Sequence, residues 1–118
     1  MPDGKVLLIE DDDDIRSALF NALEDEGYSV ITAENGREGL RALEKTDEIA
    51  IVLVDLMMPV MNGEEFIQQV KSRGHFSQIP LIVVSANADR ANKLGVSEII
   101  RKPFDLDRLL SSVKRNCA

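Results

Sequence analysis

The sequence predicts an α/β protein built on an open parallel sheet, and two features of the chain support this. Short runs of branched aliphatic residues recur along it, and runs such as Ile51–Val54 contain no polar residue, which is typical of strands buried on both faces. Between them lie segments whose apolar residues recur at helical spacing. Strands and helices that alternate in this way form a parallel sheet with helices on both faces.

Five βα units account for the chain. The expected strands are Val6–Ile9, Tyr28–Ala33, Ala50–Asp55, Leu81–Val84 and Glu98–Arg101. Because crossovers between parallel strands are right-handed, few topologies remain. We expect the flavodoxin-like, doubly wound order 2-1-3-4-5, in which the switch point for ligand binding lies between the first and third strands.

The expected helices begin at capping or turn residues. They run from Asp12 or Asp13 to Gly27, from the turn Glu34–Gly36 to about Thr46, from Asn62 or Gly63 to Arg73, from Asp89 to Leu94, and onward from Asp105. The last helix should bury an i, i+3, i+4, i+7 stripe. This stripe is Leu106, Leu109, Leu110 and Val113.

The connection between the fourth and fifth strands is short. A parallel crossover needs about a dozen residues or more, and Asn87–Ser97 provides 11. After turns at both ends, at most about two helical turns remain, so the helix Asp89–Leu94 should be truncated and marginal by propensity.

Composition limits the classes of function. The 118 residues form one expected domain, 1–118. A net charge of −7 argues against direct binding to nucleic acid or to an anionic membrane surface. No apolar run reaches the length of a membrane span. The single cysteine, Cys117, excludes an internal disulfide framework and favours a cytoplasmic location.

Acidic residues follow the two strands that flank the expected switch point. Glu10 and Asp11 come directly after the first strand, and Asp55 ends the third. Because the carboxyl ends of parallel strands meet at one edge, these carboxylates should converge there. Such a cluster needs a compensating cation, and Mg²⁺ typically uses one or two carboxylates together with waters and a phosphate.

Two further side chains should reach the same edge. Ser85 follows the fourth strand and Lys102 follows the fifth. A hydroxyl and an ammonium group beside a metal ion and a carboxylate form a cradle for a phosphoryl group. Asp55 could then act as the nucleophile and form an aspartyl phosphate.

These motifs together resemble the receiver domain of two-component response regulators. They are the acidic pair after the first strand, D-x-x-M-P-x-x-x-G from Asp55, S-A from Ser85 and K-P-F from Lys102. The resemblance extends from Val6 to about Val113 and is to a single-domain receiver like the chemotaxis regulators, with a shortened fourth helix.

The resemblance implies a role for each residue of the acidic cluster. Asp55 would be the phosphoacceptor. Glu10, Asp11, Asp55 and the main-chain carbonyl of Met57 would bind Mg²⁺, with Asp11 the more direct ligand of the acidic pair.

The resemblance also implies the remaining contacts and the partners. Ser85 would be the switch hydroxyl, and Lys102 would contact the phosphoryl group or Asp55, with a cis bond to Pro103. The phosphoryl donor would be a histidine kinase or a histidine phosphotransfer protein. The signal would pass to a downstream protein target, and the domain would have no catalytic output beyond its own phosphorylation and dephosphorylation.

Two positions depart from the pattern of the family. Ile99 stands where the family usually has an aromatic residue, three positions before the lysine, so an aromatic rotamer switch cannot operate in its usual form. Ser85 and Lys102 are 17 positions apart, which is several fewer than usual, and the missing residues fall in the short fourth helix.

Alternatives remain open at this point. The domain could be a Mg²⁺-dependent aspartyl-phosphate phosphohydrolase, although no second acid follows Asp55 closely and no cap domain is evident. A flavin-binding electron carrier would need a phosphate-binding loop where five acids, Glu10–Asp14, stand. A pseudo-receiver that only binds a partner would not need Asp11, Asp55 and Lys102. The chain could also be a receiver module of a larger hybrid sensor kinase.

Overall fold

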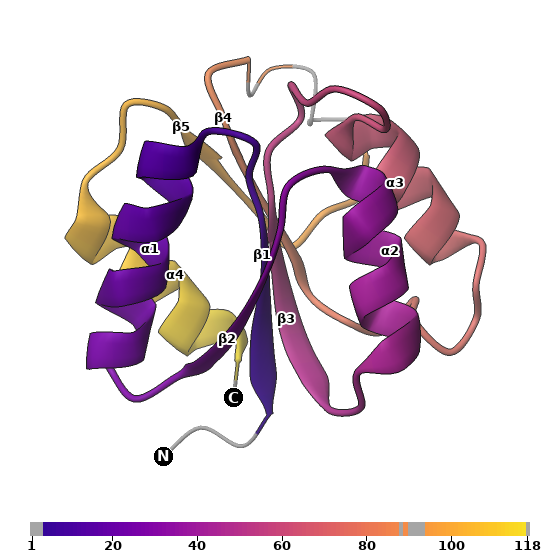
Figure 1. Ribbon diagram of the computed structural model, residues 1–118, viewed down its shortest axis with the longest axis horizontal. Helices are drawn as coiled ribbons and strands as arrows, with labels where there is room; N and C mark the ends of the chain where they lie inside the picture. The colour runs from indigo at the N-terminus through magenta and orange to yellow at the C-terminus, as the bar shows by residue number, and fades with distance from the viewer. Residues whose placement is uncertain (1–3, 88, 90–93, 118) are drawn as a thin grey trace.

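A computed structural model describes residues 4–87, 89 and 94–117 and contains the expected sheet (Figure 1). The strands are β1 Lys5–Ile9, β2 Ser29–Ala33, β3 Ile49–Val54, β4 Leu81–Ser85 and β5 Glu98–Arg101. All neighbouring strands pair in parallel, in the order β2-β1-β3-β4-β5. The flavodoxin-like topology predicted from the sequence is therefore confirmed.

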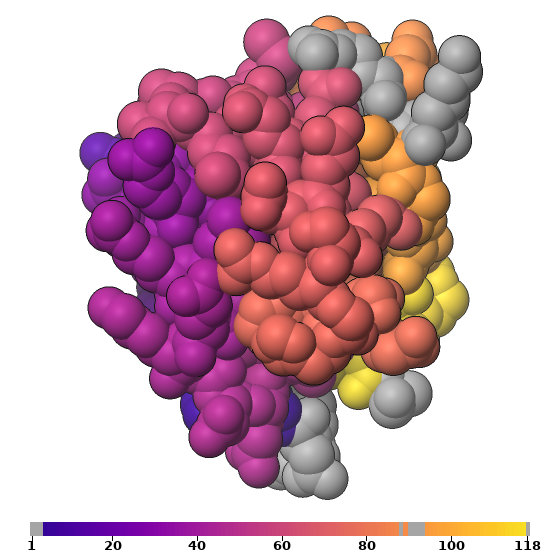
Figure 2. Space-filling view, turned by 90° about the vertical axis from the view of Figure 1, so that its right-hand side faces the viewer, coloured from indigo at the N-terminus to yellow at the C-terminus, as the bar shows by residue number. Residues whose placement is uncertain are grey.

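Helices cover both faces of the sheet. They are α1 Asp13–Asp25, α2 Gly36–Lys45, α3 Gly63–Lys71 and α4 Leu106–Asn116. Helices α1 and α4 lie on one face, and α2 and α3 lie side by side on the other (Figures 1 and 2). Within the described part of the chain, none of the helices has the length and hydropathy that a membrane span requires.

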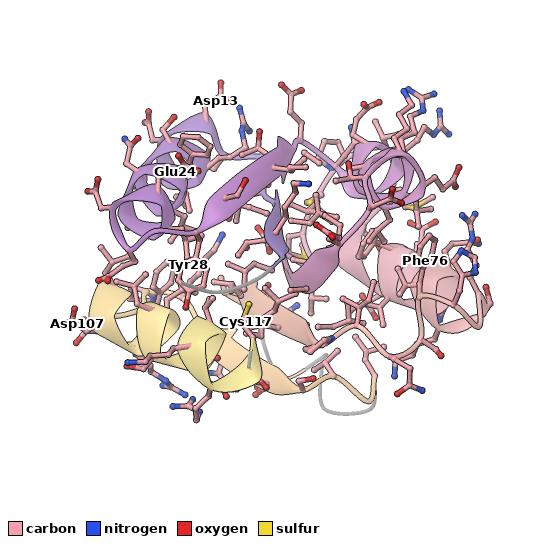
Figure 3. All side chains as sticks on the ribbon, turned by 90° about the horizontal axis from the view of Figure 1, so that it is seen from below. Asp13, Glu24, Tyr28, Phe76, Asp107 and Cys117 are labelled. Atoms are coloured by element: carbon pink, nitrogen blue, oxygen red, sulfur yellow. The ribbon has the colours of Figure 1, made fainter. Side chains whose placement is uncertain are left out.

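Alternation along the strands divides the core into two layers. In β1, Leu7 and Ile9 face α2 and α3, whereas Val6 and Leu8 face α1 and α4. Strands β3 and β4 alternate in the same way, which explains why β3 and β4 are apolar at every position except Ser85, the last residue of β4. Figure 3 shows the two layers from below, with Tyr28 and Cys117 on the α1 and α4 side and Phe76 on the opposite side.

Polar side chains cap the starts of the helices that follow β1, β2 and β3, just as Asp105 caps α4. Asp12 caps α1 by accepting a hydrogen bond from the Ile15 amide, and Asn35 caps α2 in the same way. Asn62 and Glu65 form a reciprocal capping box at the start of α3. These caps lie at the ends of the loops that follow β1, β2 and β3, so they fix the loops that form the carboxyl edge of the sheet.

The C-terminal part of the chain differs from expectation at Leu106. Leu106 was expected in the buried stripe of the last helix, but it is 41% exposed because it is the first residue of α4 and lies beyond the edge of the core. Leu109 and Val113 are buried as predicted, and Leu110 is half-buried. The predicted short helix Asp89–Leu94 falls mainly outside the described residues.

The loop between β3 and α3 turns back tightly at Gly63. The Gly63 amide donates a hydrogen bond of 3.0 Å to the Leu56 carbonyl oxygen. A Cβ atom at this position would lie 2.3 Å from the Asp55 carbonyl oxygen and 2.7 Å from the Leu56 Cα atom. The glycine of the D-x-x-M-P-x-x-x-G motif is therefore required by close backbone packing directly beneath Asp55.

We predict that Gly63→Ala lowers the free energy of unfolding by about 2 kcal/mol, because neither backbone atom can move away without displacing Asp55 or Leu56. Gly74→Ala is the matched control, since a Cβ at Gly74 would have no atom within 4 Å. Urea unfolding followed by circular dichroism measures both. Equal midpoints for the two variants would contradict the packing argument.

Candidate functional site

Glu10 lies directly after β1 and is almost completely buried, with 2% of its surface exposed. Its amide donates to the Ala33 carbonyl oxygen at 3.1 Å, which extends the pairing with β2 by one residue. One carboxylate oxygen accepts a hydrogen bond from the Lys102 ammonium at 2.6 Å, and the other accepts from the Asp12 amide at 3.2 Å. The carboxylate is therefore held in one orientation at the edge of the sheet.

Asp55 lies directly after β3, next to Glu10. Its amide donates to the Ile9 carbonyl oxygen at 3.1 Å, so the pairing of β3 with β1 continues to this residue. The side chain is buried, and its two oxygens have different partners. Oδ1 accepts from the Met57 amide at 3.1 Å, and Oδ2 accepts from the Lys102 ammonium at 3.0 Å.

Lys102 brings the fifth strand into the site. Its amide donates to the Ser85 carbonyl oxygen at 3.0 Å, which fixes the residue beside the end of β4. Its ammonium group lies between the carboxylates of Glu10 and Asp55, and 16% of the side chain is exposed. The bond from Lys102 to Pro103 is cis, as expected.

Asp11 completes a cluster of three carboxylates. One ligand atom from each of Glu10, Asp11 and Asp55 lies within 4.8 Å of the others, and Asp11 is the exposed member. A set of oxygen ligands, partly open to solvent, fits a hard divalent cation that keeps several waters. Met57 lies beside the cluster through the hydrogen bond from its amide to Asp55.

Ser85 is the last residue of β4 and is completely buried. Its hydroxyl oxygen accepts a hydrogen bond from the Asn87 amide at 3.2 Å. Among the described residues, the Ser85 hydroxyl contacts this amide and not Asp55. It nevertheless lies at the carboxyl edge of the sheet, where the sequence predicts it. A hydroxyl that accepts here keeps its own proton available for a further acceptor.

Burial and charge shift two ionisable groups in this cluster. Burial raises the pKa of Glu10 to about 7, and the neighbouring Asp55 adds to this, while the hydrogen bonds from Lys102 and from the Asp12 amide oppose it. Burial alone would lower the pKa of Lys102, but its hydrogen bonds to Glu10 and Asp55 outweigh burial and raise it. Lys102 therefore remains positively charged at neutral pH.

One residue near the site was not anticipated from the sequence. Arg16, in the first turns of α1, donates a hydrogen bond of 2.9 Å to the main-chain carbonyl oxygen of Glu10. Its position on the helix resembles that of any exposed arginine, and no periodicity marks it. Only the acidic run before it, which suits the positive end of a helix, could have suggested a nearby cation.

Comparison with known proteins identifies the family. Residues 6–114 match the family described as the response regulator receiver domain. The chain belongs to this family. Phosphorylation and Mg²⁺ are general features of these domains. The receiver motifs in this chain lie at the edge of the sheet where Lys102 contacts the buried Asp55.

Several relatives illustrate the similarity. The chain is 36% identical to the DNA-binding transcriptional regulator NtrC of Escherichia coli over 98% of its own length but 25% of that protein. It is 33% identical to the sensor histidine kinase CheAY of Helicobacter pylori, covering 94% of the chain and 15% of the kinase. The chain thus spans only a fraction of these curated relatives.

Solved structures agree over nearly the whole chain. The chemotaxis protein CheY4 of Vibrio cholerae superposes with a TM-score of 0.87 at 30% identity, covering 96% of this chain and 98% of that one. The signal receiver domain of a signal transduction histidine kinase from Syntrophus aciditrophicus gives a TM-score of 0.89 at 29% identity, covering 97% and 89%. The chemotaxis protein and the receiver domain of the histidine kinase therefore share the fold of this domain.

We predict that Glu10→Gln stabilises the metal-free protein at pH 8. Because the pKa of Glu10 is raised to about 7 in the folded state, from 4.5, folding at pH 8 carries the cost of a buried carboxylate. That cost disappears as the pH falls from about 7 towards 4.5, because the buried carboxylate then binds a proton. The variant should gain on the order of 2 kcal/mol at pH 8 and much less at pH 5.

Glu98→Gln is the control of opposite sign. Burial alone would raise the pKa of Glu98, but hydrogen bonds led by that from Arg115 lower it overall. A carboxylate with a lowered pKa stabilises the fold above its unfolded pKa, so this variant should lose stability at pH 8 and less at acid pH. Urea titrations in chelator at the two pH values measure both. A gain for Glu10→Gln that is independent of pH would argue against the assigned cause.

Proposed function

We propose that this domain is a phosphorylation-controlled signalling switch in which Asp55 accepts a phosphoryl group. The observation that carries the proposal is the Lys102 ammonium group shared by the buried carboxylates of Glu10 and Asp55, at 2.6 and 3.0 Å. A fixed cation beside a carboxylate can stabilise the charge that develops on a transferring phosphoryl group. Membership of the receiver family supports the same role.

Each residue has a defined part in the transfer. A carboxylate oxygen of Asp55 forms a bond to phosphorus as the bond from phosphorus to the donor breaks, and the donor group leaves with the electron pair. Lys102 holds one oxygen of Asp55, and the Met57 amide holds the other, so the carboxylate is oriented before the donor arrives. The Ser85 hydroxyl would donate a hydrogen bond to the transferred group.

Mg²⁺ is the cofactor that we propose for the acidic cluster. Glu10, Asp11 and Asp55, with the main-chain carbonyl of Met57, would hold it, and it would supply positive charge for a phosphate oxygen. The oxygen ligands and the exposed position of Asp11 support this choice. The carboxylates of Glu10 and Asp55 must be ionised to take part, so Glu10 makes cation binding dependent on pH.

The proposed partners are a histidine kinase or a histidine phosphotransfer protein as donor and a protein target as receiver of the signal. The acidic net charge of −7 favours contact with proteins rather than with nucleic acid. A cytoplasmic location belongs to the same proposal and is supported by the free thiol of Cys117.

Function as one module of a hybrid kinase is a second candidate. The similarity to CheAY favours it. The chain is also 34% identical to the hybrid signal transduction histidine kinase D of Dictyostelium discoideum, of which it covers 7%. The chemistry at Asp55 is the same in either setting. The phosphohydrolase alternative differs, because it requires turnover of phosphate esters, and the labelling experiment below distinguishes it.

We predict that acetyl phosphate adds a single phosphoryl group at Asp55 and that labelling requires Mg²⁺. The acidic cluster repels an anionic donor until a cation binds. Intact-mass measurement should show one added phosphoryl group on the wild type and none on Asp55→Asn. Stable modification of Asp55→Asn would refute the assignment, and catalytic release of phosphate at steady state would favour the phosphohydrolase.

We also predict that Mg²⁺ raises the melting temperature of the unphosphorylated protein, because it binds the folded state only. The rise should be larger at pH 8 than at pH 6, since protons compete for Glu10. Without metal, Asp11→Ala should itself be stabilising, because it removes one of several like charges.

Asp47→Ala is the matched control for Asp11→Ala, because Asp47 is an exposed acid in the turn before β3, at the opposite end of the sheet. Mg²⁺ should stabilise Asp47→Ala as much as the wild type and Asp11→Ala much less. An equal response of Asp11→Ala would show that Asp11 is no ligand.

A further inference from the structure

Arg16 joins three segments of the chain beside the carboxylate cluster. Its Nη1 atom donates a hydrogen bond of 2.9 Å to the Glu10 carbonyl oxygen. Its Nη2 atom donates to a carboxylate oxygen of Asp13, at the start of α1 (Figure 3), and lies 4.0 Å from one of Glu34. Only 17% of the side chain is exposed. One guanidinium group thus connects the end of β1, the first turn of α1 and the segment after β2.

The carbonyl group that Arg16 contacts belongs to a buried residue. Glu10 is 2% exposed, and its amide and both of its carboxylate oxygens already have partners. Arg16 donates the hydrogen bond that the carbonyl accepts. A buried carbonyl that loses its hydrogen bond destabilises the fold, unless the chain reorients to find another donor.

Reorientation of this carbonyl would act on Asp11. The Glu10 carbonyl and the Asp11 amide form one planar peptide group, so the hydrogen bond from Arg16 fixes the plane from which the Asp11 side chain departs. The Glu10 carboxylate is held independently by Lys102. Asp11 is exposed, so its direction depends on the main chain more than on packing.

We propose that Arg16 is a positioning residue for the divalent cation. It holds the peptide between Glu10 and Asp11 so that the Asp11 carboxylate stays within reach of Glu10 and Asp55. This inference rests on the Mg²⁺ site of the proposed function. Outer partners that orient metal ligands commonly contribute 10- to 100-fold in metal affinity.

The charge of Arg16 has the opposite effect, and this makes the inference testable. A cation close to the cluster repels Mg²⁺, so removal of charge alone would strengthen metal binding. Loss of positioning would weaken it. The sign of the change in affinity therefore separates the two roles, and a purely structural role would lower the melting temperature without a change in affinity.

The experiment is calorimetric titration of the unphosphorylated protein with Mg²⁺ alone, for the wild type, Arg16→Met, Arg16→Lys and Arg41→Met. Arg41 is the matched control, because it lines the same hollow of about 520 Å³ as Arg16 but is 58% exposed and pairs with Glu38 on its own helix. We expect roughly tenfold weaker binding for Arg16→Met and about threefold weaker binding for Arg16→Lys. The Arg41→Met variant should bind Mg²⁺ as the wild type does.

Mg²⁺ affinity that is unchanged or increased in Arg16→Met would overturn the role of Arg16 while the metal site stands. If that variant does not fold, Arg16→Lys carries the test, and wild-type affinity in it would likewise overturn the inference. No binding of Mg²⁺ by the wild type would instead refute the metal site of the proposed function, and the role of Arg16 with it.

Discussion

The pairing of one ammonium group with two buried carboxylates is the interaction on which the carboxyl edge of this sheet depends. Lys102 contacts Glu10 and Asp55 at 2.6 and 3.0 Å, and neither carboxylate is appreciably exposed. Burial of an ionised carboxylate is costly unless a partner compensates. One ammonium group cannot balance two carboxylates, so the edge keeps a surplus of negative charge, to which Asp11 adds. The cluster is thus stable enough to form and keeps a net negative charge that a bound cation would compensate.

The strand order determines how Lys102 reaches its partners. Because β5 is an edge strand and β4 lies between it and β3, the lysine side chain must cross the end of β4 to reach Asp55. The hydrogen bond that the Lys102 amide donates to the Ser85 carbonyl oxygen fixes where the side chain starts. On the other side, Gly63 allows the loop after β3 to fold tightly under Asp55. This geometry would be lost in any strand order that separates β1 from β3, since Glu10 and Asp55 are neighbours only when these two strands pair.

Much of this architecture could be predicted from the sequence, because the strand signals come from residues buried on both faces. The predictions were wrong at the ends of two elements. β1 begins at Lys5 and not at Val6, because a polar residue gives no strand signal. Leu106 was predicted to be buried but is exposed at the start of its helix. Because the carboxyl ends of parallel strands meet at one edge of a sheet, the clustering of Glu10, Asp11 and Asp55 could be predicted. It could not predict the contact of Lys102 with Glu10, 92 positions away, or of Arg16 with a carbonyl group, because these depend on side-chain directions in loops.

The shared lysine also suggests how phosphorylation at Asp55 would change the protein. A phosphoryl group would place about two negative charges where Asp55 now has one, so Lys102 would be drawn away from Glu10. Glu10 would then need either the cation or a proton, and its raised pKa makes the proton accessible near neutral pH. The Ser85 hydroxyl can donate to the new oxygens while still accepting from the Asn87 amide. Movement of that hydroxyl would therefore also displace the Asn87 backbone amide, and this would couple the proposed phosphorylation site to the start of the segment after β4.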